Sequence, residues 1–279
     1  MKRIVTIQDI SCIGKCSLTV ALPIISALGI ETAVIPTAVL STHTAFQNFT
    51  FQDLSDQILP IANHWKKEKI NFDAIYTGYL GSINQIQIIS QFYDMFKTNQ
   101  NILFVDPAMA DNGKLYPTFN QEFVKQMAWL CSRADVIVPN ITEAALMTGQ
   151  PYYQQYDSHY IRNLLHGLAK LGAKKIILTG VSYHTGEIGV AGFDTVSGKD
   201  FLYNTNKIGT MYHGTGDIFA SVCLGCFMHD MTLQQSASIA ADYVAETILI
   251  TLKDPNKRFY GVNFEQTLPT LLYKIRNAT

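Results

Sequence analysis

The feature that most constrains the fold is an alternation of short β-rich runs with longer segments of helical period. The strand candidates are rich in Ile and Val and span residues 3–8, 32–38, 74–77, 102–106, 136–139 and 175–179. The helix candidates between them span residues 17–28, 53–67, 84–97, 121–131, 143–148 and 158–171. Strands that are apolar on both faces are normally covered by helices on both sides. The pattern therefore predicts an α/β fold in which a mostly parallel sheet lies between two helical layers, a three-layer sandwich.

The organisation changes after Gly180. Residues 187–193 and 200–204 read as a hairpin, and a long helical tail follows residues 214–217. Because repeats, low-complexity tracts and Pro-, Gly- or Ser-rich linkers are absent from the sequence, we expect a single domain over residues 1–279. Polar and aromatic residues at 42–51 interrupt the strand and helix rhythm, which makes this insertion a candidate substrate loop.

Composition excludes several classes of protein. With 48% apolar residues, 15% charged residues and a net charge of -1, the chain is too apolar and too weakly charged for disorder. The same near-zero charge gives no bulk attraction to nucleic acid. The sequence also lacks a run of about 18 uncharged apolar residues, so we expect no membrane span. Five cysteines and no secretory signal indicate reduced thiols in the cytoplasm.

The most informative short motif is Gly214-Thr215-Gly216-Asp217. Two glycines let the backbone approach a ligand closely, and the helix that follows points its free N–H groups at that ligand, as in an anion-binding site. Asp217 falls in the first turn of this helix, where a carboxylate is also favoured by the helix dipole, so an ordinary helix start is the alternative. His213 precedes the motif, and for this residue a structural role is at least as well supported as a chemical one.

Two acidic residues follow strand candidates. Asp106 ends the run 102–106, and Glu143 comes shortly after the run 136–139. In an open parallel sheet ligands bind at the carboxyl ends of the strands, so both carboxylates are expected at one rim. Carboxylate oxygens there suit Mg²⁺, which takes one or two carboxylates together with waters and substrate phosphates. For Glu143 the alternative is a helix-start carboxylate three residues after a capping Asn140.

Two other motifs do not carry chemistry by themselves. Residues 14–17 resemble the end of a P-loop, but Asp9 stands where that motif needs glycine and Cys16 where it needs Ser or Thr. Cys223 and Cys226 have no second pair with which to bind zinc, and we expect them to be small core residues.

Taken together, the motifs resemble the ribokinase-like superfamily and, within it, the pyridoxal kinase branch. The resemblance covers nearly the whole chain and rests on these segments: Ile7-Gln8 followed by Gly14, Ser41-Thr42-His43-Thr44 ahead of Phe46, Thr77-Gly78-Tyr79, Asp106-Pro107, Pro139-Asn140-x-x-Glu143 and Gly214-Thr215-Gly216-Asp217. It implies ATP-dependent phosphorylation of the hydroxymethyl group of pyridoxal, pyridoxine or pyridoxamine. It further implies a homodimer with at most a small lid, which uses Mg²⁺ and often a monovalent cation, K⁺ or Na⁺.

The resemblance also implies roles for individual residues. Asp217 would be the general base on the substrate hydroxyl, and the amides offered to the transferred phosphoryl group would come from Gly214, Thr215 and Gly216. The residues implied for ATP binding are Asp106, Val138, Asn140, Glu143 and Thr179. Those implied for metal binding are Asp106 and Glu143 for Mg²⁺ and Asp111 for the monovalent cation. Those implied for the vitamin pocket are Asp9, Thr44, Tyr79 and Asp217.

The sequence departs from the family pattern at Asp9, where Ser is common, and at residues 14–18, where glycine and asparagine are usual. These departures leave the substrate preference open. One alternative is a hydroxymethylpyrimidine kinase of thiamine synthesis, a family that usually carries Cys in place of Asp217. The other is a non-catalytic vitamin-binding protein on the same fold, because fold alone does not establish function.

Overall fold

A central sheet organises the computed structural model, which describes residues 1–209 and 212–278. In this part of the chain the strand order is β11-β10-β9-β8-β5-β4-β1-β2-β3. The strands are β1 (Arg3–Ser11), β2 (Glu31–Leu40), β3 (Phe51–Asp53), β4 (Ala74–Thr77), β5 (Ile102–Val105), β8 (Val136–Ile137), β9 (Lys175–Val181), β10 (Glu187–Asp194) and β11 (Lys199–Asn206). Neighbours from β9 through β2 are parallel, and β10, β11 and β3 extend the two edges antiparallel. The mostly parallel sheet is thus confirmed.

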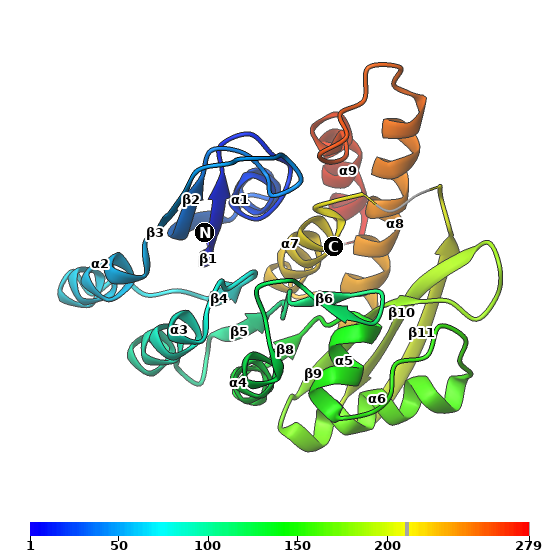
Figure 1. Cartoon of the computed structure of the whole chain (residues 1–279), viewed down its shortest axis with the longest axis horizontal. Coiled ribbons are helices and arrows are strands. Elements are labelled where there is room, and N and C mark those ends of the chain that lie inside the picture. Colours follow the sequence, from blue (N-terminus) through cyan, green and yellow to red (C-terminus); the bar gives the residue numbers. More distant parts are fainter. Residues whose placement is uncertain (210–211, 279) are drawn as a thin grey trace.

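Helices cover both faces of this sheet (Figure 1). One face carries α2 (Ser55–Lys67), α3 (Ile83–Phe96), α4 (Gln121–Ser132), α5 (Ile141–Thr148) and α6 (Ser158–Leu171). The other face carries α1 (Leu18–Ala27), α7 (Thr215–Met228), α8 (Leu233–Lys253) and α9 (Leu268–Ala278). Each helical layer encloses its own apolar core against the sheet, so the three-layer arrangement is confirmed.

The central strands contribute to both cores by simple alternation. In β5, Leu103 and Val105 pack into one core, and Phe104 packs into the other. The Phe104 side chain is 0% exposed. Successive side chains of a strand point to opposite faces, so a strand buried on both faces must be apolar at every position. This is why these strands were readable from the sequence.

Several short elements differ from the sequence-based expectation. Strand β3 pairs with β2 through Phe51, Gln52 and Asp53, which are all exposed and therefore have no apolar pattern. A small hairpin of β6 (Ala110–Asp111) and β7 (Lys114–Leu115) follows β5. The run expected at 136–139 is shorter as a regular strand, because β8 ends at Ile137. The tail is divided into α7, α8, a short 3₁₀ turn η1 (Phe264–Gln266) and α9.

The expectation for the cysteine pair in the helical tail is supported. Cys223 and Cys226 are fully buried in α7, as expected for core residues. None of the helices within the described ranges has both the length and the apolar character that a membrane crossing requires.

Candidate active site

A cavity of about 520 Å³ opens at the carboxyl ends of the parallel strands. Its walls come from the segments after β5 and β8, from β9, β10 and β11, from the segment before α7, and from α7 and α8. Most of the predicted site residues line it: Asp106, Asp111, Val138, Asn140, Glu143, Thr179, Gly214, Thr215, Gly216 and Asp217. The structure therefore brings together residues that lie more than 100 positions apart in the sequence.

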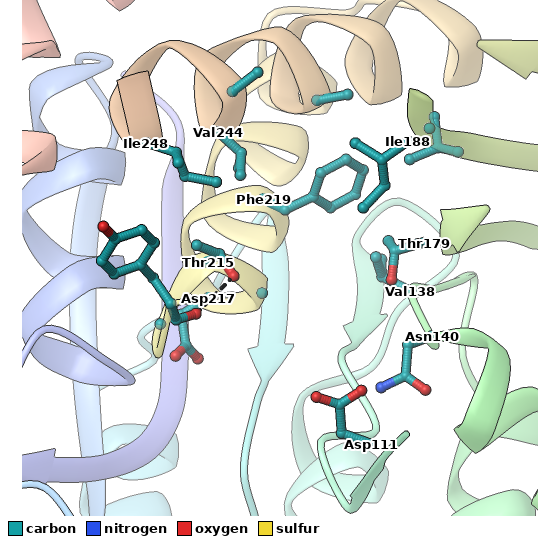
Figure 2. Close-up of a pocket in the computed structure, with 18 of the residues that line it drawn as sticks. Asp111, Val138, Asn140, Thr179, Ile188, Thr215, Asp217, Phe219, Val244 and Ile248 are labelled. Carbon is teal, nitrogen blue, oxygen red and sulfur yellow. Dashed lines mark hydrogen bonds between the residues drawn. The ribbon is translucent and has the colours of Figure 1, made fainter. Parts of the chain in front are cut away.

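The cavity has an apolar end and a polar end (Figure 2). Ile188 of β10, Phe219 of α7 and Val244 and Ile248 of α8 gather at the apolar end. Asp111, Asn140 and Asp217 lie toward the other end. A ligand that combines a flat apolar group with anionic groups matches this division.

The N-terminus of α7 has the geometry expected of an anion-binding site. Gly214 is the N-cap residue, with φ 79° and ψ 0°, and no side chain caps the helix. A Cβ atom at Gly214 would lie only 1.8 Å from the Lys15 carbonyl oxygen, so glycine alone fits. The first N–H groups of a helix have no partners within the helix, and here they remain available to an anion.

The carboxylate of Asp217 stands in the first turn of α7, next to these amides. Desolvation raises its pKa to about 7, and the charge of Asp9 contributes to the rise, whereas a hydrogen bond donated by the Ser17 backbone N–H opposes it. An acid of this pKa can accept and release a proton near neutral pH, which is what a general base requires.

Ser17 links Asp217 to a second buried carboxylate. While its backbone N–H donates to Asp217, its hydroxyl donates to Asp9 Oδ1 at 2.7 Å. Ser17 has a φ of 49°, in the left-handed region that non-glycine residues rarely adopt, at the N-cap of α1. The loop between β1 and α1 therefore holds two acids in place through one residue.

Asp106 and Glu143 form a second acidic group in the cavity. Burial raises the pKa of Asp106 well above its ordinary value, and the charges of Glu143 and Asp217 add to this effect. Burial also raises the pKa of Glu143, to about 7. The predicted convergence of Asp106, Glu143 and Asp217 on one rim is consistent with this mutual electrostatic effect.

Glu143 also has the structural role that was considered as its alternative. Its Oε2 atom accepts a hydrogen bond from the Asn140 backbone N–H at 2.8 Å, and its Oε1 atom accepts one from Met109 N–H at 3.0 Å. Asn140 Oδ1 in turn accepts from Glu143 N–H, which completes a capping box at the start of α5. Glu143 therefore secures the segment after Asp106 as well as placing a carboxylate at the rim.

The acids of the cavity fit magnesium only in a restricted sense. In the described ranges 1–209 and 212–278, no three His, Cys, Asp or Glu side chains are grouped closely enough to hold a metal ion. Mg²⁺ in nucleotide sites needs only one or two carboxylates, because waters and phosphate oxygens complete its shell. Asp106 and Glu143 suit that mode of binding, in which the metal arrives with an anionic ligand.

Of the four residues predicted for a vitamin pocket, Asp217 lines this cavity, whereas Asp9, Thr44 and Tyr79 are not among its lining residues. Asp9 is buried beside Asp217, and its charge also raises the pKa of Tyr79 after the larger effect of burial. The Tyr79 ring packs against Phe119 with 5.6 Å between centroids. Thr44 is exposed in the loop between β2 and β3. The structure thus places Asp9 close to both Asp217 and Tyr79, and Thr44 on a separate loop.

Sequence reasoning missed two contributions to this site. One is Ser17, for which no role in the site was predicted from the sequence. The other is His43, whose ring lies 4.6 Å from the ring of His213 and so joins the loop after β2 to the loop before Gly214. Burial, then the neighbouring His213, lowers the pKa of His43 to about 4, so it is neutral at pH 7. A histidine in each of two distant loops gives no local signal of such a contact.

Comparisons with known proteins agree with this geometry. The family model described as phosphomethylpyrimidine kinase matches residues 22–261. A pyridoxal kinase from Dictyostelium discoideum is 28% identical over 269 residues, covering 88% of this chain and 86% of that protein. The crystal structure of pyridoxal kinase from Lactobacillus plantarum is 30% identical, covers 99% of both chains and superposes with a TM-score of 0.90. A candidate phosphomethylpyrimidine kinase from Bacteroides thetaiotaomicron, crystallised with pyridoxal, is 36% identical, covers 97% of this chain and 95% of that chain, and has a TM-score of 0.92.

Proposed function

The chain belongs to the phosphomethylpyrimidine kinase family, and from this membership and the geometry of its site we propose that it is a pyridoxal kinase. It transfers the γ-phosphoryl group of ATP to the hydroxymethyl group of pyridoxal, pyridoxine or pyridoxamine. The observation that carries the proposal is the placement of Asp217, with a pKa of about 7, in the first turn of α7 beside the uncapped N–H groups that follow Gly214.

The reaction follows from this placement. The Asp217 carboxylate accepts the proton of the hydroxymethyl O–H as that oxygen forms a bond to the γ-phosphorus, and the bond between phosphorus and the bridging oxygen of ADP breaks. Because the transition state is loose, the protein contributes mainly by positioning the reactants and offsetting the charge on the equatorial oxygens. The N–H groups at the start of α7 face that charge, and the apolar end of the cavity suits the adenine ring.

Metal ions have a supporting role in this proposal. Asp106 and Glu143 would hold Mg²⁺ through its waters, and Asp111 would contribute to a monovalent cation site. Bound there, the cations supply positive charge that neutralises the phosphate oxygens. The chain's own contribution is to keep these carboxylates at the rim, which the hydrogen bonds of Glu143 to Asn140 and Met109 accomplish.

The vitamin would bind on the side of Asp217 that faces Asp9 and Tyr79, with Thr44 contributing from its loop. Asp9 is a buried carboxylate held by Ser17, and the natural partner for such a group is a cationic N–H donor. A protonated pyridine nitrogen is a donor of this kind. The relative from Bacteroides thetaiotaomicron, crystallised with pyridoxal, supports a pyridine ligand for this family.

We predict that Asp9→Asn lowers kcat/KM for the B6 vitamers by about 10- to 100-fold, the range expected for losing a hydrogen bond between charged groups. Asparagine keeps an acceptor for the Ser17 hydroxyl, so the change removes mainly the charge. Steady-state kinetics with pyridoxal, pyridoxine and pyridoxamine measure the effect. Asp73→Asn is the control, because Asp73 accepts from Arg3 N–H at the opposite end of the sheet. Values of kcat/KM in Asp9→Asn that stay within about threefold of the wild type for all three vitamers would contradict this role.

Hydroxymethylpyrimidine phosphorylation is the second candidate, favoured by the description of the matching family model. Against it stands Asp217, where that activity is usually associated with Cys. The proposed function itself is tested by incubating the purified protein with ATP and pyridoxal and identifying the product by mass spectrometry. We expect a product heavier by one phosphoryl group, with ADP released in equal amount. Absence of a phosphorylated vitamer would refute the proposal.

Three further expectations stay predictions. The homodimer implied by the resemblance can be measured by analytical ultracentrifugation. The single domain can be tested by limited proteolysis. The cytoplasmic location is compatible with the cysteines, which are all free thiols with Cys12 alone exposed.

A further inference from the structure

We propose that Lys15 is a positioning residue for phosphoryl transfer. Its side chain connects the loop between β1 and α1 to the segment between α8 and α9. This connection fixes two backbone groups of the loop: the Lys15 carbonyl, which packs on Gly214, and the Ser17 N–H, which donates to Asp217. This inference rests on the proposed kinase function and concerns a residue that matched no binding motif.

The Lys15 side chain makes three contacts with the segment between α8 and α9. Its Nζ atom donates to Glu265 Oε2 at 2.8 Å and to Asn263 Oδ1 at 3.3 Å. It also lies 5.8 Å from the centre of the Phe264 ring. The side chain is only 16% exposed, whereas that of Glu265 is 52% exposed. A lysine that is largely removed from water and has an anionic, an amide and an aromatic partner is held in one direction.

That direction distinguishes this lysine from a phosphate ligand. A P-loop lysine extends toward the phosphates, but Lys15 donates to a segment more than 240 residues further along the chain. The residue therefore does not supply charge to the reaction. Its contribution passes through the backbone of its own loop.

The backbone of this loop contacts both parts of the catalytic machinery. The Lys15 carbonyl packs so closely on Gly214 that a Cβ atom there would lie 1.8 Å from the oxygen. Two residues later, the Ser17 N–H donates to Asp217 and the Ser17 hydroxyl donates to Asp9. Gly14 precedes Lys15 in the same loop. A loop that starts beside a glycine and continues through the left-handed φ of Ser17 has little regular structure of its own, so a side-chain anchor has a clear effect on it.

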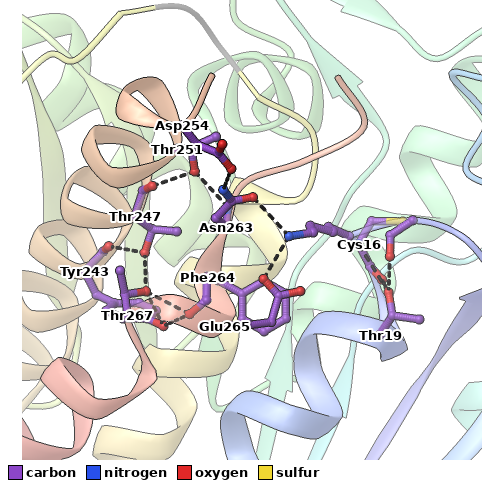
Figure 3. A network of polar contacts seen from close by, with 12 residues as sticks. Cys16, Thr19, Tyr243, Thr247, Thr251, Asp254, Asn263, Phe264, Glu265 and Thr267 are labelled. Atoms are coloured by element: carbon purple, nitrogen blue, oxygen red, sulfur yellow. Dashed lines mark hydrogen bonds and ion pairs between the residues drawn. The ribbon is translucent and has the colours of Figure 1, made fainter. Parts of the chain in front are cut away.

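The segment that receives the Lys15 side chain is itself held by a network of hydrogen bonds (Figure 3). Asn263 N–H donates to Thr251 Oγ1 at 2.7 Å, and Asn263 Nδ2 donates to Asp254 Oδ2 at 2.8 Å. The Phe264 carbonyl accepts from the hydroxyls of Tyr243 at 3.0 Å and Thr267 at 2.8 Å. Apart from Asp254, these groups are buried, and a satisfied buried network holds its members in a single arrangement.

The same network ends on the helix that lines the cavity. Tyr243 and Thr251 lie on α8, whose Val244 and Ile248 form part of the apolar wall. Lys15 therefore connects α8, which forms part of the apolar wall proposed for the nucleotide, with the loop between β1 and α1, which contacts Asp217. Removing its side chain leaves the apolar wall intact but releases the loop, so the expected loss is in kcat and not in the KM for ATP.

The test compares variants in a coupled assay of ADP release with pyridoxal. We expect Lys15→Gln to lower kcat at least about tenfold while the KM for ATP changes less than about threefold. Lys15→Arg, which can still reach Glu265, should recover most of kcat. Glu265→Gln should also lower kcat. The double variant of Lys15→Gln and Glu265→Gln should be at most about twofold slower than Lys15→Gln alone, because both changes break the same connection.

Lys2→Gln is the matched control, since Lys2 forms an ion pair of the same 2.8 Å length with Asp230, away from the site. It should leave kcat unchanged. If Lys15→Gln lowers only the melting temperature, with kcat per folded molecule equal to that of the wild type, or if Lys15→Arg behaves like Lys15→Gln, the positioning role is refuted. Wild-type protein that releases no ADP with pyridoxal refutes the proposed function instead, so the two failures are distinguishable.

Discussion

The Asp217→Asn variant is expected to turn over at least about a hundredfold more slowly than the wild type while it still binds ATP. Asparagine has nearly the shape of aspartate but cannot accept the hydroxymethyl proton, and loss of a general base typically costs a factor of about 100 to 10,000. Binding of ATP should persist, because the apolar end of the cavity comes from other residues, among them Val244 and Ile248. Single-turnover kinetics and calorimetric titration with ATP measure the two quantities.

The pH dependence provides a second readout of the same residue. Asp217 acts as a base only when it is deprotonated, so wild-type kcat/KM should be full above its pKa of about 7 and fall as the pH drops below it. Glu143 also has a pKa of about 7, so the profile of the wild type does not assign the group. The assignment comes from Asp217→Asn, whose residual activity should lack the fall due to Asp217. Turnover near that of the wild type would remove Asp217 from the mechanism.

Gly214→Ala is expected to lower kcat by about a hundredfold or more. The added Cβ atom would lie 1.8 Å from the Lys15 carbonyl oxygen, so the backbone at the start of α7 must move. The N–H groups that face the phosphoryl group move with it, and loss of one such preorganised donor typically costs about 100- to 1,000-fold in kcat. Alanine also tolerates the φ of 79° at this position poorly.

Gly29→Ala separates the steric effect from the backbone effect. Gly29 has a φ of 78°, almost the value at Gly214, but a Cβ atom there meets nothing within 4 Å. It follows α1, in the turn that leads to β2. This variant should lose stability by about 1 kcal/mol and keep its kcat. If Gly214→Ala is as active as Gly29→Ala, the close packing on Lys15 has no catalytic importance.

The fold was largely predictable because its central strands are buried on both faces. Such strands read as continuous apolar runs, as β5 does between Ile102 and Val105. Strand β3 was not predictable, because its three residues are exposed and pair with β2 only through the backbone. The hairpin of β6 and β7, with two residues in each strand, is likewise too short to produce a period.

Site residues could be predicted from the sequence where they directly follow a strand or lie at the start of a helix. Asp106 and Glu143 follow strands, and Asp217 starts a helix after two glycines, so their positions in the fold could be derived from the local sequence. Ser17, His43 and Lys15 could not be identified in the same way. Lys15 contacts Glu265, 250 residues away, and such a contact depends on how the layers pack and not on any local pattern.

We propose a B6 vitamer as the acceptor, and this choice is tested by measuring ADP release with pyridoxal, pyridoxine, pyridoxamine and hydroxymethylpyrimidine under identical conditions. We expect kcat/KM for at least one B6 vitamer to exceed that for the pyrimidine by about tenfold or more. Turnover with the pyrimidine alone would contradict the claim in favour of a thiamine-pathway kinase. Vitamer binding without turnover of any acceptor would contradict it in favour of a non-catalytic binding protein.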